Sequence, residues 1–416
     1  MLMTQVYKLC NDVTREVLGE DAVVNEDLSN VVDIGDSIAN LNLLDNYVRT
    51  LVDHIGKMVF VNRAYSGTAP SILMDSWEYG SILEKVTYDG LPEATENESW
   101  ELEDGEEYNP NIFTQPKVSA KFFDKRVTFE VPMSFAERQV KSAFSSAAQL
   151  NAFFSMIYTA IDKSMTVKTD GLIERTVNNF IGETLYTGAN TPRSINLLSG
   201  YNTAFDAELT ADEAIYTPEF IRYAAYIIKL YSDRLIKIST LFNGGGKERF
   251  TPKDMQKILM LSEFKSSADV YLQSDTFHNE LTALPTADEI PYWQGSGLGY
   301  DFKSTSAINV KTSAGNTVAQ AGILCCIFDR DALGVSNLSK RVTTDWNAKG
   351  EFWNNWYKFD AGYFNDFNEN GIVFHMGALE PTPAPEPPVP PVSTAVNRDV
   401  KKLMKSRENQ PLHISK

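Results

Sequence analysis

Cysteine and histidine, the residues from which disulfide frameworks and many metal sites are built, are scarce in this chain. The 416 residues include three cysteines and four histidines. Cys325 and Cys326 are neighbours on a predicted strand, so their side chains point to opposite faces and are expected to pack in a core. The third cysteine is Cys10, and the histidines, which show no metal-ligand spacing, are His54, His278, His375 and His413. The sequence therefore predicts neither a disulfide framework nor a metal site.

A long apolar run is also missing. The longest one, around Ile323 to Phe328, is far too short to cross a bilayer, which takes about 20 apolar residues. The N-terminal residues lack the apolar core of a signal peptide. We therefore expect a protein made in the cytoplasm, with no membrane partner.

Positive charge is in deficit. The chain has 38 Lys and Arg against 55 Asp and Glu, which gives a net charge of −17. This balance argues against a sequence-specific nucleic-acid binder, which would show a basic face, although it allows incidental contact with DNA. Residues 89–107 hold nine carboxylates and no Lys or Arg. Such a run repels itself and stays at the surface.

Recognisable catalytic and cofactor motifs are absent. Gly244-Gly245-Gly246-Lys247 departs from the phosphate-loop pattern, because Leu241 stands where a glycine is needed and Glu248 follows the lysine. We predict a flexible loop there. The carboxylates of residues 89–107 could supply an acid–base pair or a calcium site, but they lack the glycine-punctuated spacing of a calcium loop. The sequence predicts no catalytic residue and no cofactor.

The segment that stands out by what it contains is strongly aromatic. Nine aromatic residues lie in it: Phe352, Trp353, Trp356, Tyr357, Phe359, Tyr363, Phe364, Phe367 and Phe374. Each large ring can bury roughly 150–250 Å². Because a segment this aromatic would aggregate if exposed, we expect it to pack inside a domain or against another copy. It indicates a structural role.

Two long elements precede that segment. Residues 59–131 read as two strand arms joined by the acidic stretch, which predicts a projecting hairpin. The alternation shifts phase at Phe122–Phe123, so a bulge or strong twist is expected there. An apolar stripe from Ala147 to Leu185 then predicts a helix that would span about 58 Å, with Gly171 as a possible interruption.

The remaining segments carry weaker signals. Residues 1–35 are polar and predict an extended arm, followed by a helix from Ile38 to Ile55. Residues 206–324 read as an α/β lobe. Its expected elements are helices beginning at Thr217-Pro218 and Thr251-Pro252, a strand over Asp269–Leu272 and a strand from Gly322 to Phe328. Residues 378–392 contain seven prolines and predict a semi-rigid linker that leads to a basic tail.

Taken in order, these parts resemble the major capsid proteins of tailed bacteriophages, which have the HK97-like fold. The nearest likeness is to the capsid proteins of phi29-type podoviruses, over roughly residues 36–377. The stretches that carry it are Asn46–Gly56, Asp269-Val270-Tyr271-Leu272, Asp329-Arg330-Asp331 and Trp353-Asn354-Asn355-Trp356-Tyr357. Their order and spacing carry the resemblance more than any single motif.

The resemblance implies an α+β fold with a defined domain order. The implied parts are an N-terminal arm and first helix (1–58), a projecting β-hairpin or E-loop (59–131), a first part of the P-domain with a long spine helix (132–205), an α/β A-domain (206–324), a second part of the P-domain (325–377), and a Pro-rich linker with a basic tail (378–416).

The resemblance also implies a function without enzymatic activity. Copies would self-assemble through pentamers and hexamers into an icosahedral shell around double-stranded DNA, forming the virion capsid in the host cytoplasm. The implied partners are a scaffolding protein, a portal and, non-specifically, the packaged DNA. The aromatic candidates for inter-subunit contacts are Phe60, Trp77, Trp100, Phe113 and Phe129, with packing inside the hairpin as the alternative for each. The alternative functions are a tail-associated or other surface structural protein and, less favoured, a carboxylate-dependent glycan hydrolase.

Overall fold

The computed structural model describes residues 3–20, 22–40, 43, 46–51, 54, 69–74, 83–88, 104, 111, 113, 115, 117–143, 145–189, 191–273, 284–293 and 306–377. The chain divides into two compact units. Unit 1 comprises Met1–Ser81, Asp124–Ile173 and Val335–Tyr363, and unit 2 comprises Ile82–Phe123, Glu174–Gly334 and Phe364–Lys416. Helices and strands contribute to both, so the predicted α+β class is confirmed.

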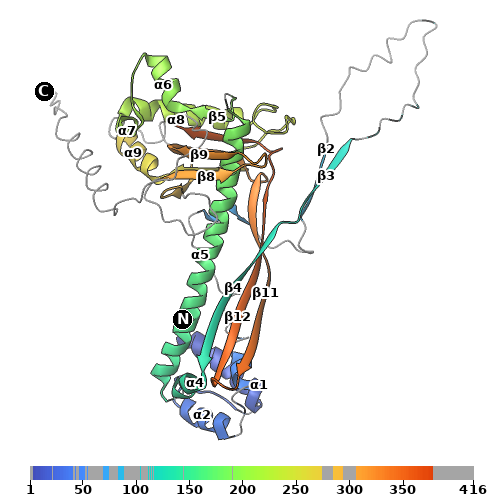
Figure 1. Ribbon diagram of the computed structural model, residues 1–416, viewed down its shortest axis with the longest axis vertical. Helices are drawn as coiled ribbons and strands as arrows, with labels where there is room; N and C mark the ends of the chain where they lie inside the picture. Colours follow the sequence, from blue (N-terminus) through green and yellow to red (C-terminus); the bar gives the residue numbers. More distant parts are fainter. Residues whose placement is uncertain are drawn as a thin grey trace, which may run out of the picture. The chain divides into compact units, whose positions relative to one another are not determined.

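Unit 1 is built on a four-stranded sheet in the order β1-β11-β12-β4. The short β1 (Leu73–Met74), which follows a 3-10 turn at Pro70–Ile72, runs parallel to β11 (Leu333–Asn347). The long strands β12 (Phe352–Asn365) and β4 (Arg126–Ala136) pair antiparallel from Phe352↔Ala136 to Gly362↔Arg126. Figure 1 shows β4, β11 and β12 side by side.

The longest helix is α5 (Ala147–Thr187), with 41 residues. It confirms the helix predicted over residues 147–185, and Gly171 does not interrupt it. The short α4 (Glu137–Ala143) connects it to β4. The N-terminal part of α5, up to Ile173, belongs to unit 1, and the rest belongs to unit 2.

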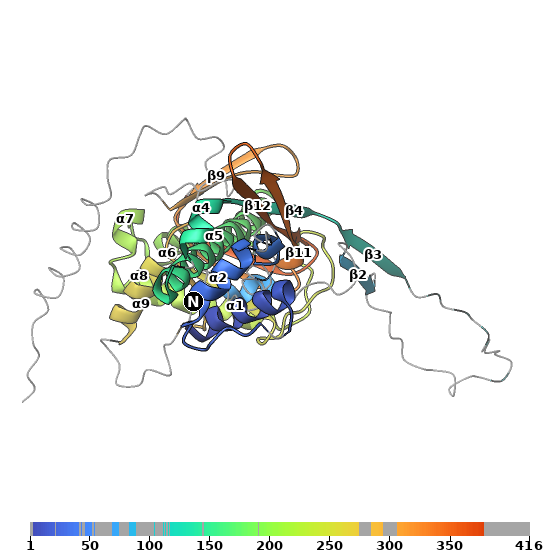
Figure 2. The same cartoon turned by 90° about the horizontal axis from the view of Figure 1, so that it is seen from below.

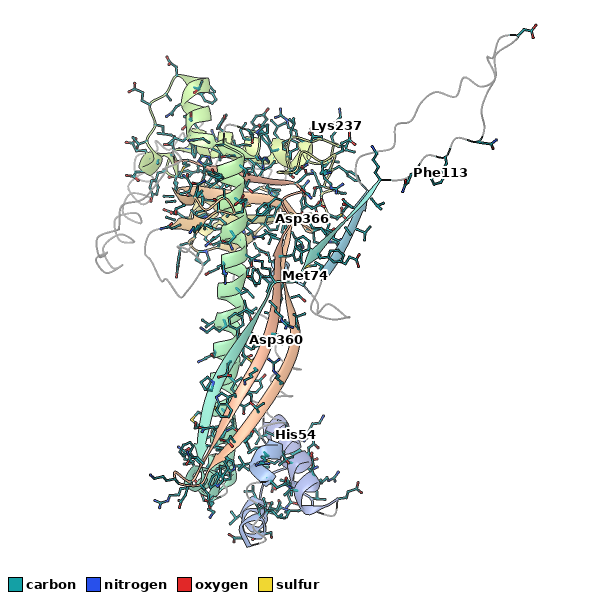
Figure 3. The ribbon with its side chains drawn as sticks, turned by 45° about the vertical axis from the view of Figure 1, so that its right-hand side comes forward. His54, Met74, Phe113, Lys237, Asp360 and Asp366 are labelled. Carbon is teal, nitrogen blue, oxygen red and sulfur yellow. The ribbon has the colours of Figure 1, made fainter. Side chains whose placement is uncertain are left out.

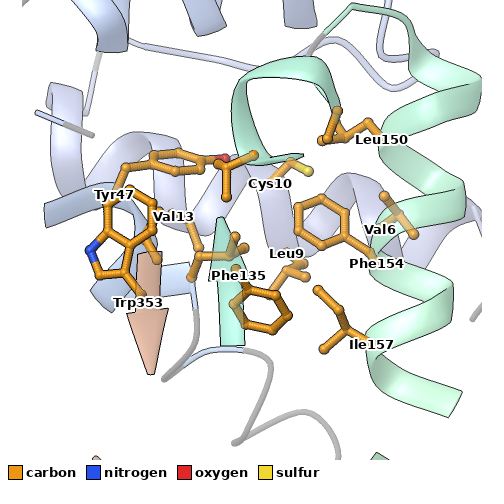
Figure 4. Packing of buried hydrophobic residues seen from close by; sticks show 14 of the residues in the cluster. Val6, Leu9, Cys10, Val13, Tyr47, Phe135, Leu150, Phe154, Ile157 and Trp353 are labelled. Carbon is orange, nitrogen blue, oxygen red and sulfur yellow. The ribbon is translucent and has the colours of Figure 1, made fainter. Parts of the chain in front are cut away.

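The core of unit 1 lies between α5, the sheet and the N-terminal helices. Period-two alternation places Trp353, Tyr357 and Phe359 on one face of β12, and all three are buried. Helical spacing brings Leu150, Phe154 and Ile157 of α5 to the same core (Figure 4), and Ile161 also belongs to it. The first half of the aromatic segment therefore packs inside a folded unit, which is one of the two alternatives predicted from the sequence.

The extended arm predicted for residues 1–35 is wrong. Helices α1 (Met3–Leu18) and α2 (Val31–Asn40) occupy most of this region and lie next to each other (Figure 2). A narrow stripe on α1 is buried in the unit 1 core: Val6, Leu9, Cys10 and Val13. Its i, i+3, i+4, i+7 spacing is helical, but the polar residues around it hide the stripe in average composition. Ile38 lies within α2, and residues 46–51 and 54 are also helical.

Unit 2 contains a five-stranded sheet in the order β5-β13-β10-β6-β7. The five strands are β5 (Ser194–Asn196), β13 (Gly371–His375), β10 (Ile323–Asp329), β6 (Gln256–Leu261) and β7 (Asp288–Ile290). The central strand β10 pairs antiparallel with β13 and β6, and all of its residues are buried. This confirms the strand predicted at Gly322–Phe328 and the core positions of Cys325 and Cys326.

Four helices accompany this sheet: α6 (Leu197–Phe205), α7 (Ala211–Ala214), α8 (Pro218–Arg234) and α9 (Ser262–Gln273). Helix α8 begins as predicted, with Thr217 as N-cap and Pro218 in the first turn. It packs beside α9 and α6, as Figures 1 and 2 both show.

Two predictions in this region are wrong. The helix predicted from Thr251 is a turn followed by β6, because Ile258, Leu259 and Met260 are buried between β10 and β7. The strand predicted over Asp269–Leu272 belongs to helix α9, whose buried Phe264 and Ala268 have helical i, i+4 spacing. In both cases tertiary burial overrides the local pattern.

A β-hairpin docks on the C-terminal half of α5. It consists of β8 (Ala307–Lys311) and β9 (Thr317–Ala321), and its tip is held because Ser313 donates to the Glu183 carboxylate from N (3.0 Å) and Oγ (2.7 Å). Gly182 allows close approach, since a Cβ there would lie 3.1 Å from Cβ of Val310. Among the described residues, none of the helices combines the length and apolar character that crossing a membrane requires.

We predict that Gly371→Ala destabilises unit 2. A Cβ at this buried position would lie 2.7 Å from Cε1 of Phe180, whose ring stacks on Phe367 and contacts Phe328. The ring cannot yield freely, so we expect a loss of about 1–3 kcal/mol in the free energy of unfolding, measured by denaturant titration. The exposed control Thr317→Ala should change it by less than about 0.5 kcal/mol. Wild-type stability in Gly371→Ala would contradict the tight packing.

Candidate interaction surface

Unit 2 also contains a separate two-stranded β-ribbon. Strands β2 (Leu83–Tyr88) and β3 (Val118–Phe123) pair antiparallel from Leu83↔Phe123 to Tyr88↔Val118. They form the paired strands of the hairpin predicted over residues 59–131, but residues 73–74 and 126–131 of that range belong instead to β1 and β4 of the unit 1 sheet. The predicted return strand is divided by a two-residue break at Asp124–Lys125, just after the predicted phase shift at Phe122–Phe123.

The register sorts the ribbon side chains onto two faces of different character. Residues directly opposite each other in an antiparallel pair project to the same face. The inner face carries the pairs Leu83/Phe123, Lys85/Lys121 and Thr87/Ser119. The outer face carries Glu84/Phe122, Val86/Ala120 and, opposite the end of β2, Val118. The ribbon is therefore amphipathic.

The outer face exposes large apolar side chains. Val86 is 62% exposed, Phe122 61% and Val118 64%. These values are high for three large apolar residues that lie on one face of one ribbon, and such patches mark interaction sites. Phe113 is 85% exposed, and Figure 3 places it beyond the Tyr88–Val118 end of the ribbon, away from Asp366.

The inner face is held by ions. Lys121 Nζ lies 2.7 Å from Asp366 Oδ1, and Lys85 Nζ lies 3.1 Å from Asp366 Oδ2 and 2.6 Å from Glu369 Oε1. Arg249 Nε lies 3.4 Å from the other Glu369 oxygen. Both carboxylates are nearly buried, whereas Lys121 is 44% exposed. Lysines from both ribbon strands therefore form ion pairs with the turn that follows β12.

The charge state of Asp366 follows from these contacts. Burial alone would raise the pKa of this carboxyl group, since it disfavours the charged form. The hydrogen bond from Lys121, the charge of Lys85 and the N–H of Asn368 outweigh that effect and hold the pKa below its ordinary value. Asp366 is therefore ionised at neutral pH.

The predicted contact residues fall into different places. Phe113 lies on the exposed part of unit 2. Phe129 lies on β4 in unit 1, where its ring is 5.1 Å from that of Phe359 and packs against the core, so it takes part in its own sheet. Phe60, Trp77 and Trp100 lie outside the described residues. The structure therefore brings none of the described candidates together.

Sequence reasoning missed the outer face of the ribbon. The alternation of Val118, Ala120 and Phe122 with Ser119, Lys121 and Phe123 was a readable signal for two different faces. The ionic partners Asp366 and Glu369 lie more than 240 residues away along the chain and left no comparable signal.

The glycine-rich segment is a fixed turn. Gly244 N donates to Phe367 O at 2.7 Å, and the Asn243 side chain bonds both backbone groups of Lys247. The predicted flexible loop is thus held in place by local hydrogen bonds. Within the described ranges, no group of three or more His, Cys, Asp or Glu side chains is arranged to hold a metal ion.

A buried histidine lies on β13 in the five-stranded sheet of unit 2, between β5 and β10. His375 on β13 is 3% exposed, with Nδ1 2.8 Å from Gly377 O and Nε2 3.2 Å from Ser194 Oγ. A neutral ring satisfies both, donating from Nδ1 and accepting at Nε2. Burial lowers the pKa of His375, partly offset by the hydrogen bond to Gly377. Because both ring nitrogens are partnered inside the sheet, the contacts of His375 are structural.

Comparison with known proteins identifies the family. Residues 10–375 match the model of the Phi29-like phage major capsid protein. The chain therefore belongs to this family and is a viral capsid component. The resemblance to phi29-type capsid proteins is confirmed, and so is the role of a bacteriophage major capsid protein.

Individual relatives are distant. The major capsid protein of Bacillus phage GA-1 is 22% identical over 183 residues, which cover 42% of this chain and 37% of that relative. The capsid structure of Staphylococcus phage Andhra covers 75% of this chain and 85% of its own, at 10% identity and a TM-score of 0.47. The mature capsid of bacteriophage PhiM1 covers 76% and 87%, at 8% identity and a TM-score of 0.40.

We predict that acidification weakens unit 2 through His375. Its pKa is lower in the folded than in the unfolded chain, so the unfolded chain binds an extra proton between the two values. The free energy of unfolding should fall as the pH drops from about 7 through the unfolded value of about 6.5 to the folded pKa. Urea titrations across this range should show a smaller fall for His375→Asn. An equal fall in both proteins would contradict the assignment.

Proposed function

We propose that this capsid protein acts by self-association, with the β2–β3 ribbon of the predicted E-loop (59–131) lying on a neighbouring copy. The observation that carries this proposal is the apolar outer face of the ribbon in a chain of this family. Burial of Val86, Val118 and Phe122 on a neighbour would contribute about 1.5–3 kcal/mol for each fully buried side chain. Closed symmetry would multiply these modest contacts.

The proposal extends to the other parts of the chain. Residues 132–205 and 325–377 would form the P-domain, and residues 206–324 the A-domain around the axis of pentamers and hexamers. Together these would close an icosahedral shell around double-stranded DNA. The domain order implied by the resemblance supports this assignment, as does the long helix α5. We infer no enzymatic activity, because the family is one of structural proteins.

The partners follow from the same assignment. The net charge of −17 would keep contact with packaged DNA weak and non-specific, which suits a wall along which DNA slides. A scaffolding protein and a portal would guide assembly in the host cytoplasm. A tail-associated role is less well supported, since the matching family is that of the major capsid protein.

We predict that the double variant Val86→Ser/Phe122→Ser abolishes assembly at concentrations where the wild type forms particles. The two serines remove apolar area from the outer face and leave the ionic inner face unchanged. A loss of about 3–6 kcal/mol per contact corresponds to a 100-fold or greater rise in the assembly concentration. Light scattering with negative-stain microscopy measures this threshold.

The matched control is Met156→Ser/Val167→Ser on α5. Met156 is 60% exposed and Val167 45%, so the change in exposed apolar surface is comparable, but neither residue lies on the ribbon. We expect particles at nearly the wild-type concentration. Assembly of the ribbon variant at that same concentration would rule out the outer face as the contact.

A further inference from the structure

The ionic cluster under the ribbon has an arrangement that packing alone does not require. Lys85 and Lys121 are directly opposite each other on the inner face, and like charges in this position repel. Asp366 relieves the repulsion, because each of its two oxygens binds a lysine from a different strand. One carboxylate is thus straddled by both strands.

The turn that carries Asp366 and Glu369 is held in place by hydrogen bonds. Asp366 N donates to Ala332 O at 2.6 Å, and Asp366 Oδ1 accepts from Asn368 N at 3.1 Å. The turn is also tied to the sheet, since Asp329 N donates to Asn370 O at 2.9 Å. Glu369 is further paired with Arg249. A rigid support of this kind fixes the direction of whatever the carboxylates bind.

The cluster is the outermost described attachment of the ribbon. Closer to the break, the Phe123 ring packs on Phe364 with a centroid distance of 5.1 Å. Further out, the Thr87 and Ser119 hydroxyl groups lie 3.2 Å apart and bond each other. The ions therefore act at the point where the ribbon leaves the body of unit 2.

We propose that Asp366 and Glu369 are positioning residues that form an ionic latch with Lys85 and Lys121, and that this latch fixes the direction in which the ribbon presents its apolar face. Only the second part of this inference, the presentation of the apolar face to a neighbouring copy, rests on the proposed function. Partly buried ion pairs contribute little net stability, but they are specific in geometry. The latch therefore acts on orientation more than on folding.

The test measures ribbon orientation in the unassembled full-length protein. Spin labels at Ala120→Cys on the outer face and Thr240→Cys on the body of unit 2 report their distance by pulsed electron resonance. Cys10, Cys325 and Cys326 are buried and escape labelling, since burial also raises the pKa of each thiol. With the latch intact, we expect one narrow distance distribution.

The informative variant is neutral: Lys85→Met/Lys121→Met/Asp366→Asn/Glu369→Gln. It leaves no unpaired lysine or carboxylate of the latch behind, and the amide oxygen introduced at position 369 can still accept from Arg249, so unit 2 should keep its near-ultraviolet circular dichroism. We expect a broadened distance distribution and about tenfold faster amide exchange in β2 and β3. Lys85→Arg/Lys121→Arg should restore the narrow distribution, and the exposed control Lys117→Met should never lose it.

The outcomes separate this inference from the proposed function. A narrow distribution in the neutral variant would overturn the latch, as would a broad one with unchanged assembly. If the latch behaves as expected but Val86→Ser/Phe122→Ser still assembles, the proposed contact fails while the ribbon anchor stands. The single variant Asp366→Asn is the control for unfolding. In it Glu369 still binds Lys85, so we expect only a partial broadening of the distance distribution.

Discussion

The constraint on which this structure depends is that a two-stranded ribbon has two faces and unit 2 covers one of them. The register of β2 and β3 puts the lysines on the covered face, where Asp366 and Glu369 bind them. The same register leaves Val86, Val118 and Phe122 on the open face. Exposure of this apolar face to water is unfavourable, which supports the proposal that a neighbouring copy covers it.

The aromatic segment, in contrast to the ribbon, is buried within its own subunit. Strand β12 buries Trp353, Tyr357 and Phe359 against α5 and the N-terminal helices of its own unit. Phe367 and Phe374 are packed in unit 2, against Phe180 and Tyr231 respectively. These rings stabilise the subunit itself. The large apolar side chains that stay exposed lie elsewhere, among them Val86, Val118 and Phe122 on the ribbon.

Helices and strands were predictable from the sequence where one hydrophobic pattern runs through the whole segment. Helix α5, the start of α8 at Pro218 and the buried strand β10 all follow from the sequence. The α1 stripe was missed because four apolar positions are diluted by polar neighbours, and β6 and α9 were misassigned because their burial depends on distant partners. The hairpin was predictable from its strand pattern. The latch was not, since its lysines and carboxylates meet only after the chain folds.

The most direct test of the central claim is to identify what lies against Phe122 in the particle. A photo-reactive benzoylphenylalanine at position 122 forms a covalent bond with whatever it contacts on irradiation. Assembled particles should yield adducts joining two copies of the chain, and the unassembled protein should not. Adducts confined to a single copy in assembled particles would contradict the account.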